Sequence, residues 1–315
     1  MNKSDIKIVF MGTPEFASVC LDTLLEAKFN VVAVVSQPDK PVGRKHVITP
    51  PPTKVRALEA GIPVFQPDSM KTDESYEEIK KYSPDLIITA AYGKLLPERV
   101  LNIPTYGCIN AHGSLLPKYR GASPVQMAIL NGEAVTGVTV MKMDIGMDTG
   151  DMISKVEVPI DENIDTDGLM MELAKAGGEL LVNTIEDYVN GKIAPVPQDE
   201  ALSTHCSMIK PEDGIFNWND DATTIHNKVR ALKTWPGAQT SLDGKRVKVY
   251  ETAIYRDGDF DAAPAGTVVK AHKGDLIVAC GNGYLKILEL QLEGGKRLKA
   301  IDCAHNYKVG TVFGN

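Results

Sequence analysis

The tripeptide Asn110-Ala111-His112 contains two side chains that can act together on one oxygen atom. It follows a short apolar run, so we expect it to end a buried strand, where residues i and i+2 point to the same side. A carboxamide and a protonated imidazole can both donate hydrogen bonds, as a tetrahedral oxyanion requires. Hydrogen-bonded Asn and His are also common structural residues. The tripeptide alone therefore leaves a catalytic and a structural interpretation open.

An acidic loop at residues 143–151, with the sequence MDIGMDTGD, is the second candidate. A carboxylate close to His112 would favour the protonated imidazole and could relay a proton. Asp and Gly are equally the ordinary residues of a solvated turn. The acidic spacing lacks the terminal bidentate Glu of an EF-hand, which makes a calcium loop the weaker alternative.

A basic segment punctuated by Pro and Gly, residues 36–45, is the third candidate and continues to the prolines at 50–52. It is long for a connection between a strand and a helix. Basic loops at the ligand end of a sheet often act as lids or contact nucleic acid. A flexible, solvated connection is the alternative.

Several familiar motifs are absent from the sequence. The first strand-to-helix turn holds only Gly12, without the G-x-G-x-x-G pattern of a dinucleotide site. We find no P-loop, no zinc-ligand spacing and no G-x-S-x-G elbow. What remains is acyl-type chemistry carried by hydrogen-bond donors and one acid/base group, without a covalent nucleophile.

The first part of the chain alternates apolar strand-like runs with amphipathic helical stretches. We predict buried strands at residues 6–11, 30–36, 62–65, 85–90 and 107–110, two further strands at 137–143 and 152–160, and a long helix at 167–190. Such alternation predicts an α/β, Rossmann-like and mostly parallel sheet with helices on both faces. Ligands of these folds bind beyond the carboxyl ends of the strands.

The pattern of apolar and polar residues changes after Lys210. Short strand-like runs at 246–250, 266–269, 276–280 and 284–292 are separated by glycine-bearing turns, which predicts a small antiparallel OB-like β-barrel. Residues 1–209 carry 19 Lys and Arg against 28 Asp and Glu, whereas residues 210–315 carry 15 against 13. We therefore predict a catalytic domain at 1–190, a linker at 191–209 and a second domain at 210–315.

The composition is that of an ordinary soluble protein, with 43% hydrophobic and 24% charged residues among 315. No apolar run is long enough to span a membrane, and the amino-terminal residues lack the layout of a signal peptide. Five scattered cysteines without a C-x-x-C pair argue against a disulfide framework or a zinc ribbon and fit a reducing compartment. We expect a cytoplasmic protein without a membrane partner.

These features together resemble the methionyl-tRNA formyltransferase family, and the resemblance runs along essentially the whole chain. The matching segments are MGTPEFA at 11–17, QPDKPVGR at 37–44, PVFQP at 63–67, AYGKLLP at 91–97, INAHGSLLPKYRGASP at 109–124, TGVTVMKMDIGMDTGDM at 136–152, KPEDGIFNW at 210–218 and RALKTWPGA at 230–238. Thr234 departs from the proline that is more common in the family, a change within a loop.

The resemblance implies transfer of a formyl group from 10-formyltetrahydrofolate to the α-amino group of initiator methionyl-tRNA, for translation initiation and without a metal. It implies a catalytic set of Asn110, His112 and Asp148, and folate contacts at Ser114, Leu115, Leu116 and Pro117. We predict tRNA contacts at Lys40, Arg44, Lys45, Lys210, Arg230, Lys245, Arg246 and Lys248, and we expect a monomer.

Two alternatives stay open. The Asn-x-His and Asp set is shared by folate-dependent formyltransferases that act on other amines, such as an amino sugar nucleotide, so it specifies the reaction and not the acceptor. Such an acceptor would not require the basic segment at 36–45. A non-catalytic RNA-binding protein on the same scaffold is the other alternative. It would be expected to lose the catalytic set, yet all three residues are present.

Overall fold

The computed structural model describes residues 1–43, 46–258 and 260–315. By its internal contacts the chain forms two compact units. The first unit contains Met1–Pro124, Val135–Pro159 and Met170–Cys206, and the second contains Val125–Ala134, Ile160–Leu169 and Ser207–Asn315.

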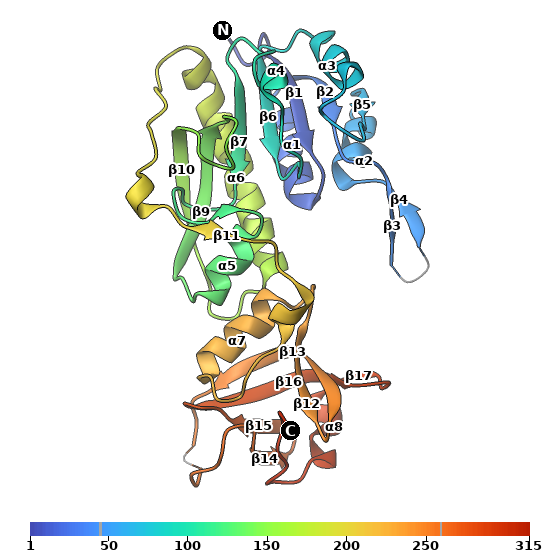
Figure 1. Cartoon of the computed structure of the whole chain (residues 1–315), viewed down its shortest axis with the longest axis vertical. Helices are drawn as coiled ribbons and strands as arrows, with labels where there is room; N and C mark the ends of the chain where they lie inside the picture. The colour runs from blue at the N-terminus through green and yellow to red at the C-terminus, as the bar shows by residue number, and fades with distance from the viewer. Residues whose placement is uncertain (44–45, 259) are drawn as a thin grey trace. The chain divides into compact units, whose positions relative to one another are not determined.

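A seven-stranded sheet in the order β10-β9-β7-β6-β1-β2-β5 forms the centre of the first unit (Figure 1). Its strands are β1 (Lys7–Gly12), β2 (Asn30–Val35), β5 (Val64–Phe65), β6 (Leu86–Ala90), β7 (Cys108–His112), β9 (Val135–Lys142) and β10 (Met152–Pro159). The neighbouring strands from β5 to β7 pair in parallel. Strand β9 pairs antiparallel with both of its neighbours, β7 and β10. Every residue of β6 is buried, because helices cover both faces of a parallel sheet. The predicted Rossmann-like, mostly parallel sheet is confirmed.

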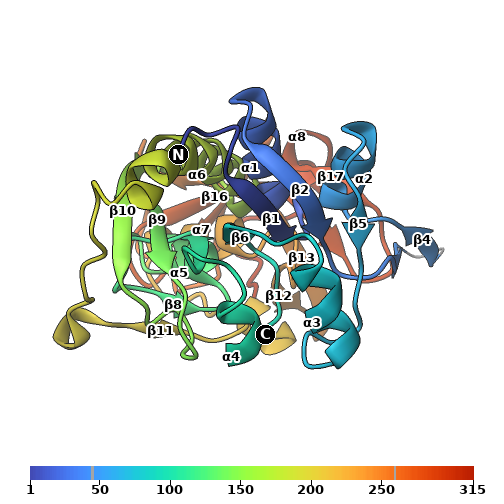
Figure 2. The ribbon, with the colours of Figure 1, turned by 90° about the horizontal axis from the view of Figure 1, so that it is seen from above.

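The helices connecting these strands cover the two faces of the sheet. They are α1 (Glu15–Glu26), α2 (Pro52–Glu59), α3 (Asp73–Lys80), α4 (Glu98–Leu101), α5 (Pro124–Leu130) and α6 (Thr166–Val189). Figure 2 shows α1 and α6 on one face and α3 and α4 on the other. Helix α1 buries a stripe formed by Phe16, Cys20 and Leu24, the spacing of one helical face. Helix α3 begins after Thr72, whose hydroxyl accepts the Ser75 N–H at 3.2 Å, a normal N-terminal cap.

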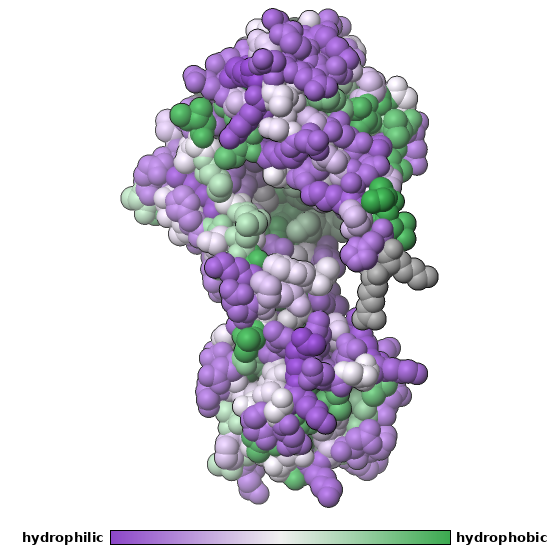
Figure 3. Space-filling model, turned by 45° about the vertical axis from the view of Figure 1, so that its right-hand side comes forward, coloured by the Kyte–Doolittle hydropathy of each residue, from purple (hydrophilic) through white to green (hydrophobic). Residues whose placement is uncertain are grey.

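The segment predicted as a basic loop contains a hairpin of β3 (Lys40–Val42) and β4 (Val47–Thr49). Lys54 and Gln66 anchor its base, since the Lys54 ammonium lies 2.8 Å from the Asp39 carboxylate and Gln66 donates to the same group at 2.8 Å. Hydrophobic residues gather on the hairpin in Figure 3, where Val42, Val47 and Ile48 are more than half exposed.

Residues 191–206, which fall in the predicted linker, belong to the first unit. They contain the 3-10 helix η1 (Glu200–Leu202) and the strand β11 (His205–Cys206). Strand β11 pairs in parallel with β8 (Arg120–Gly121), which follows the predicted site at the end of β7. This part of the chain is therefore packed structure. The domain boundaries at 190 and 210 remain a prediction.

A six-stranded antiparallel sheet forms the second unit, in the order β12-β13-β16-β15-β14 with β17 paired to β16. Its strands are β12 (Ala238–Leu242), β13 (Lys245–Tyr255), β14 (Val268–His272), β15 (Asp275–Ala279), β16 (Tyr284–Leu292) and β17 (Arg297–Lys299). Phe313 N–H donates to the Gly266 carbonyl and Gly314 N–H to the Ser241 carbonyl, both at 2.8 Å. The carboxyl-terminal segment thus joins the two edges of the sheet, which agrees with the predicted small antiparallel barrel.

Helix α7 (Ala222–Ala231) was missed by the sequence analysis, which predicted only strands in this region. Asp221 caps it by accepting the Thr224 N–H at 2.8 Å, and Ile225 and Val229 pack into the core of the unit. The remaining short helices are η2 (Pro211–Gly214), α8 (Ala300–Cys303) and η3 (Ala304–Asn306). None of the helices in the described ranges is both long and apolar enough to cross a bilayer.

His226 on α7 is held in its neutral form inside the second unit. Its Nε2 lies 3.0 Å from the Glu162 carbonyl oxygen, which can only accept, so Nε2 carries the hydrogen. Its Nδ1 then accepts from the Thr252 hydroxyl at 2.9 Å. Burial lowers the pKa of His226, and the charge of Arg230 acts in the same direction.

We predict that the second unit loses stability as the pH falls below about 6.5, the ordinary pKa of histidine. Below that pH the unfolded chain binds a proton at His226 that the folded state takes up less readily, so unfolding is favoured. Trp218 and Trp235, the two tryptophans of the chain, both lie in this unit, so their fluorescence reports its unfolding by denaturant. His226→Gln should flatten the decline between pH 7.5 and 5.5. An equal decline in both proteins would contradict the assignment.

Candidate active site

The end of β7 and the acidic loop after β9 meet in the first unit. His112 is the last residue of β7, and its Nδ1 lies 3.7 Å from Asp148 Oδ2. This is longer than a direct hydrogen bond but within ion-pair distance. The two groups, which are far apart in sequence, are therefore brought together as the sequence analysis anticipated.

A backbone carbonyl sets the orientation of the His112 ring. The imidazole is 6% exposed, and its Nε2 lies 2.9 Å from the Tyr119 carbonyl oxygen. A carbonyl can only accept, so Nε2 carries the hydrogen in every protonation state. Nδ1 is consequently the nitrogen that faces Asp148 and is the one available for proton exchange.

A neighbouring strand orients the Asn110 amide. The Thr89 hydroxyl donates to Asn110 Oδ1 at 2.8 Å, and the two residues are directly paired across β6 and β7. Because Oδ1 is occupied, the two hydrogens of Nδ2 point away from Thr89, and no acceptor among the described residues takes them. Sequence reasoning missed Thr89, since nothing in the apolar run of β6 marks one threonine as a partner of Asn110.

Asp148 is held in a backbone conformation that few residues adopt. Its φ is +56°, in the left-handed region, where Asp and Asn are the most tolerated residues after glycine. The Gly121 N–H donates to Asp148 Oδ2 at 2.9 Å. A single hydrogen bond from the chain after β7 thus turns the carboxylate toward His112.

The predicted folate contacts are only partly accessible. Ser114 and Leu116 are fully buried, at 0% and 1% exposure, which corrects the prediction for these side chains. The Ser114 hydroxyl donates to the Lys118 carbonyl at 2.6 Å, and Thr139 bridges the Ser114 carbonyl and the Leu116 N–H. These interactions attach the turn after β7 to β9, so both side chains support the site. Leu115 and Pro117 are half-buried and stay available.

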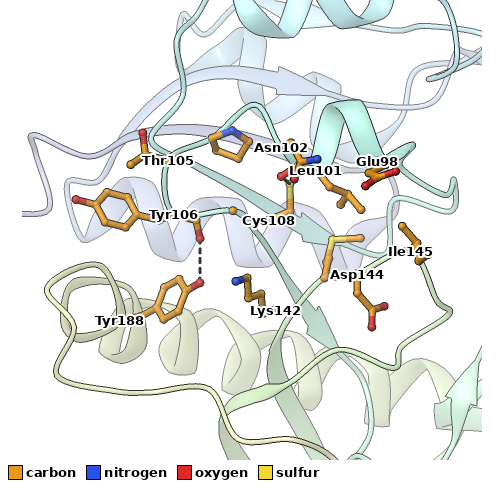
Figure 4. Close-up of a pocket in the computed structure, with 13 residues that line it drawn as sticks. Glu98, Leu101, Asn102, Thr105, Tyr106, Cys108, Lys142, Asp144, Ile145 and Tyr188 are labelled. Atoms are coloured by element: carbon orange, nitrogen blue, oxygen red, sulfur yellow. Dashed lines mark hydrogen bonds between the residues drawn. The ribbon is translucent and has the colours of Figure 1, made fainter.

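A cavity of about 570 Å³ opens beside the start of β7 (Figure 4). Its size is that of a typical small-ligand site. Leu101, Cys108, Met143, Asp144 and Ile145 form part of its wall, and on the opposite side Tyr188 donates to the Tyr106 carbonyl at 2.9 Å. The cavity and the site are built from the same two chain segments. Cys108 lines the cavity and precedes Asn110 on β7, and Ile145 lines it and precedes Asp148 in the acidic loop. Sequence reasoning did not identify this cavity.

The cysteine thiols close to the site are not nucleophiles. Burial raises the pKa of Cys108 to about 12 and also raises the pKa of Cys206. A thiolate is the reactive form of cysteine, so both groups are inert near neutral pH. The arrangement instead offers an amide donor, one imidazole nitrogen and a carboxylate, which suits acyl transfer through a stabilised oxyanion.

The basic residues predicted to contact tRNA fall into different environments. Lys40 is exposed and donates to Gln37 Oε1 at 2.7 Å, whereas Arg44 and Lys45 lie outside the described residues. In the second unit Lys210, Lys245 and Arg246 are exposed and Lys248 is half-buried.

Arg230 requires a correction, because it is 7% exposed. Its guanidinium donates to Asn227 Oδ1 and to the carbonyls of Asp161 and Ile164, at 2.9 to 3.1 Å. An arginine with its donors committed inside the fold cannot also bind a phosphate. Its role is to hold residues 161–164 against α7.

Comparison with known proteins places this geometry in a family. The formyl transferase model matches residues 6–185, and the model of the formyl transferase C-terminal domain matches residues 208–308. The methionyl-tRNA formyltransferase of Citrifermentans bemidjiense is 48% identical over 304 residues, which cover 96% of this chain and 94% of the relative.

Solved structures share the fold at low identity. HypX from Aquifex aeolicus, in complex with tetrahydrofolic acid, is 19% identical with a TM-score of 0.65, over 95% of this chain and 47% of that one. The N-formyltransferase of Helicobacter canadensis, in complex with folinic acid and dTDP-3-aminofucose, is 20% identical with a TM-score of 0.65, over 90% and 98%. The long match to a close relative and the match of both family models show that this chain belongs to the methionyl-tRNA formyltransferase family.

Proposed function

We propose that this protein transfers the formyl group of 10-formyltetrahydrofolate to the α-amino group of initiator methionyl-tRNA. The observation that carries the proposal is the cluster of Asn110, His112 and Asp148 in a chain 48% identical to a methionyl-tRNA formyltransferase. An amino sugar nucleotide is the alternative acceptor, and it is supported by structures about 20% identical, such as that of Helicobacter canadensis.

The chemistry follows from the donors in the site. The neutral amine attacks the formyl carbon, and a carbon–nitrogen bond forms as the carbonyl oxygen takes up negative charge. Asn110 Nδ2 and a protonated His112 Nδ1 stabilise that oxyanion. The Asp148 carboxylate lies 3.7 Å from the same nitrogen, where its negative charge attracts the positive charge of the imidazole during the step. When the tetrahedral intermediate collapses, the bond to the folate nitrogen breaks, the attacking amine loses a proton and the folate nitrogen gains one.

The fused ring of the folate is proposed to enter the cavity beside β7. Ile145 and Leu101 supply apolar contacts there, and the exposed backbone of the acidic loop can pair with the polar edge of the ring. Leu115 and Pro117, half-buried residues of the turn after β7, are proposed to contact the rest of the folate. The solved complex of HypX with tetrahydrofolic acid supports a folate on this fold.

The tRNA is proposed to be held by the β3–β4 hairpin and by the second unit. The hairpin exposes apolar side chains, and in the sequence Arg44 and Lys45 fall between β3 and β4, outside the described residues. In the second unit Arg246 and Lys248 lie on the same face of β13, because alternate residues of a strand point to the same side. Their partners across β12 are the polar residues Ser241 and Gln239, so this face suits phosphate groups. The domains at 1–190 and 210–315 would then carry catalysis and tRNA affinity.

The decisive experiment compares acceptors at equal concentration with 10-formyltetrahydrofolate as donor. Initiator methionyl-tRNA, elongator methionyl-tRNA and a dTDP-linked amino sugar would be tested, with the formylated product measured for each. We expect the initiator species to be formylated most efficiently. Faster formylation of the amino sugar than of methionyl-tRNA would overturn the proposal.

Replacement of the catalytic groups should slow the chemistry while folate still binds. We expect His112→Ala to reduce the single-turnover rate about a hundredfold, the usual effect of removing an oxyanion donor. Asp148→Asn should also slow it, since Asn can still accept the Gly121 N–H but cannot support a charged imidazole. Folate affinity would be measured by calorimetry. His272→Ala, which changes an exposed histidine of the second unit, is the control. Near-normal rates in both site variants would exclude the mechanism.

Neutralising two cations of the second unit should weaken tRNA binding in a salt-dependent way. For Arg246→Ser with Lys248→Ser we expect a smaller slope of log Kd against log salt, by about 0.9 for each phosphate that the protein no longer neutralises. The control is Lys270→Gln with Lys286→Gln, which removes the same amount of charge from two ammonium groups that both lie 2.6 Å from the Asp275 carboxylate and are paired with it. Equal slopes for the two pairs would show that β13 binds no phosphate.

A further inference from the structure

Arg120 is a buried charge beside the active site, and its partners come from residues 198–200. Its side chain is 2% exposed, and burial of a guanidinium is costly unless its donors are satisfied. Nε and Nη2 donate to Gln198 Oε1 at 3.0 and 2.9 Å, and Nη1 and Nη2 donate to the Glu200 carboxylate at 3.0 and 2.7 Å. The guanidinium can only donate, so it determines that the oxygen of the Gln198 amide faces it.

The nitrogen of the same amide therefore points the other way, into the acidic loop. Gln198 Nε2 donates to the Asp148 carbonyl and to the Gly150 carbonyl, both at 2.8 Å. Both hydrogens of the amide are used, and the side chain is 9% exposed. One glutamine thus joins the buried Arg120 to two backbone positions of the loop that carries the proposed catalytic carboxylate.

The loop needs such support. Asp148 has a φ of +56°, a conformation that persists only where the surroundings hold it. Gly150 packs so closely that a side chain there would meet the Lys142 carbonyl oxygen at 1.8 Å. Gly121, next to Arg120, fixes the Asp148 carboxylate itself. Gly121 therefore holds the Asp148 carboxylate directly. Its neighbour Arg120 holds the Asp148 backbone through Gln198.

Given the catalytic role proposed for Asp148, we infer that Gln198 is a positioning residue for formyl transfer. It acts through the Asp148 loop and sets the distance between the carboxylate and His112 Nδ1. Gln198 lies in the segment that the sequence analysis treated as a linker, so that segment contributes to catalysis. A misplacement of about 1 Å in a reacting group can cost on the order of a hundredfold in rate.

Two substitutions separate the functions of the amide. Gln198→Glu keeps an oxygen for Arg120 and replaces the donors to the loop by an acceptor facing two carbonyls. Gln198→Met removes both functions without adding charge. We expect kcat to fall about tenfold or more in each variant. The KM for methionyl-tRNA should stay within about twofold, because the residues proposed to contact the tRNA do not bond to Gln198. Thermal unfolding would be measured in parallel.

Glu200→Gln is the matched control, since the Glu200 carboxylate also binds Arg120 but is largely exposed and belongs to η1, outside the acidic loop. Its kcat should remain close to that of the unchanged protein. The change Gln198→Met should also lose its effect on kcat when combined with Asp148→Asn, because Gln198 acts through that carboxylate.

The outcomes distinguish the two proposals. A normal kcat for Asp148→Asn would overturn the proposed role of Asp148. A slow Asp148→Asn with a normal kcat in both Gln198 variants would overturn the role of Gln198 alone. Reduced thermal stability of the Gln198 variants at unchanged kcat would leave Gln198 a structural residue and would equally overturn its positioning role.

Discussion

The backbone of Tyr119–Gly121 is the constraint on which the site depends. The Tyr119 carbonyl accepts from His112 and the Gly121 N–H donates to Asp148, so one short segment orients both titratable groups. Buried backbone groups must be paired, and the other edge of this segment pairs with residues 204–206. Gly121 is required there, because its φ is +114° and a side chain would meet the Cys206 carbonyl oxygen at 2.3 Å. Close packing of two strands therefore sets the separation of acid and imidazole.

The parallel sheet orients the remaining group of the site, the Asn110 amide. Its register places Thr89 beside Asn110, and a hydroxyl on one strand thereby selects the direction of an amide on the next. The donors of the site are in this way oriented before any substrate arrives, which is the condition under which hydrogen bonds stabilise a developing charge most effectively. Burial raises the pKa of Cys108 to about 12, so its thiol adds no charge to the neighbouring cavity.

The cations of the second unit are of two kinds. Arg230, Lys270 and Lys286 are bound to carbonyls or to a carboxylate within the unit and serve its fold. Arg246 and Lys248 share one face of β13, and their side chains have no ion pair among the described residues. A count of basic residues therefore overstates what is available for a nucleic acid. The near-neutral balance of this part of the chain fits a surface where a few well-placed cations carry the attraction.

Local patterns in the sequence were sufficient for the fold class, and they singled out Asn110 and His112 as candidate residues. Apolar runs alternating with amphipathic stretches predicted the parallel sheet, and glycine-bearing turns predicted the antiparallel second fold, because both signals depend on near neighbours in the chain. The spacing of Asn110 and His112 placed them on one strand end, and the family resemblance added Asp148. Helix α7 was missed, since its short amphipathic pattern lies among strand-like runs.

Only the tertiary structure decided which of these residues face solvent and which atoms they present. Ser114, Leu116 and Arg230 are typical surface or site candidates in sequence but are buried and internally bonded. The pairing of Gln198 with Asp148 joins positions 50 residues apart, and that of Thr89 with Asn110 crosses two strands. Burial and the choice of a hydrogen-bond partner depend on what other segments place nearby, and no local pattern contains that information.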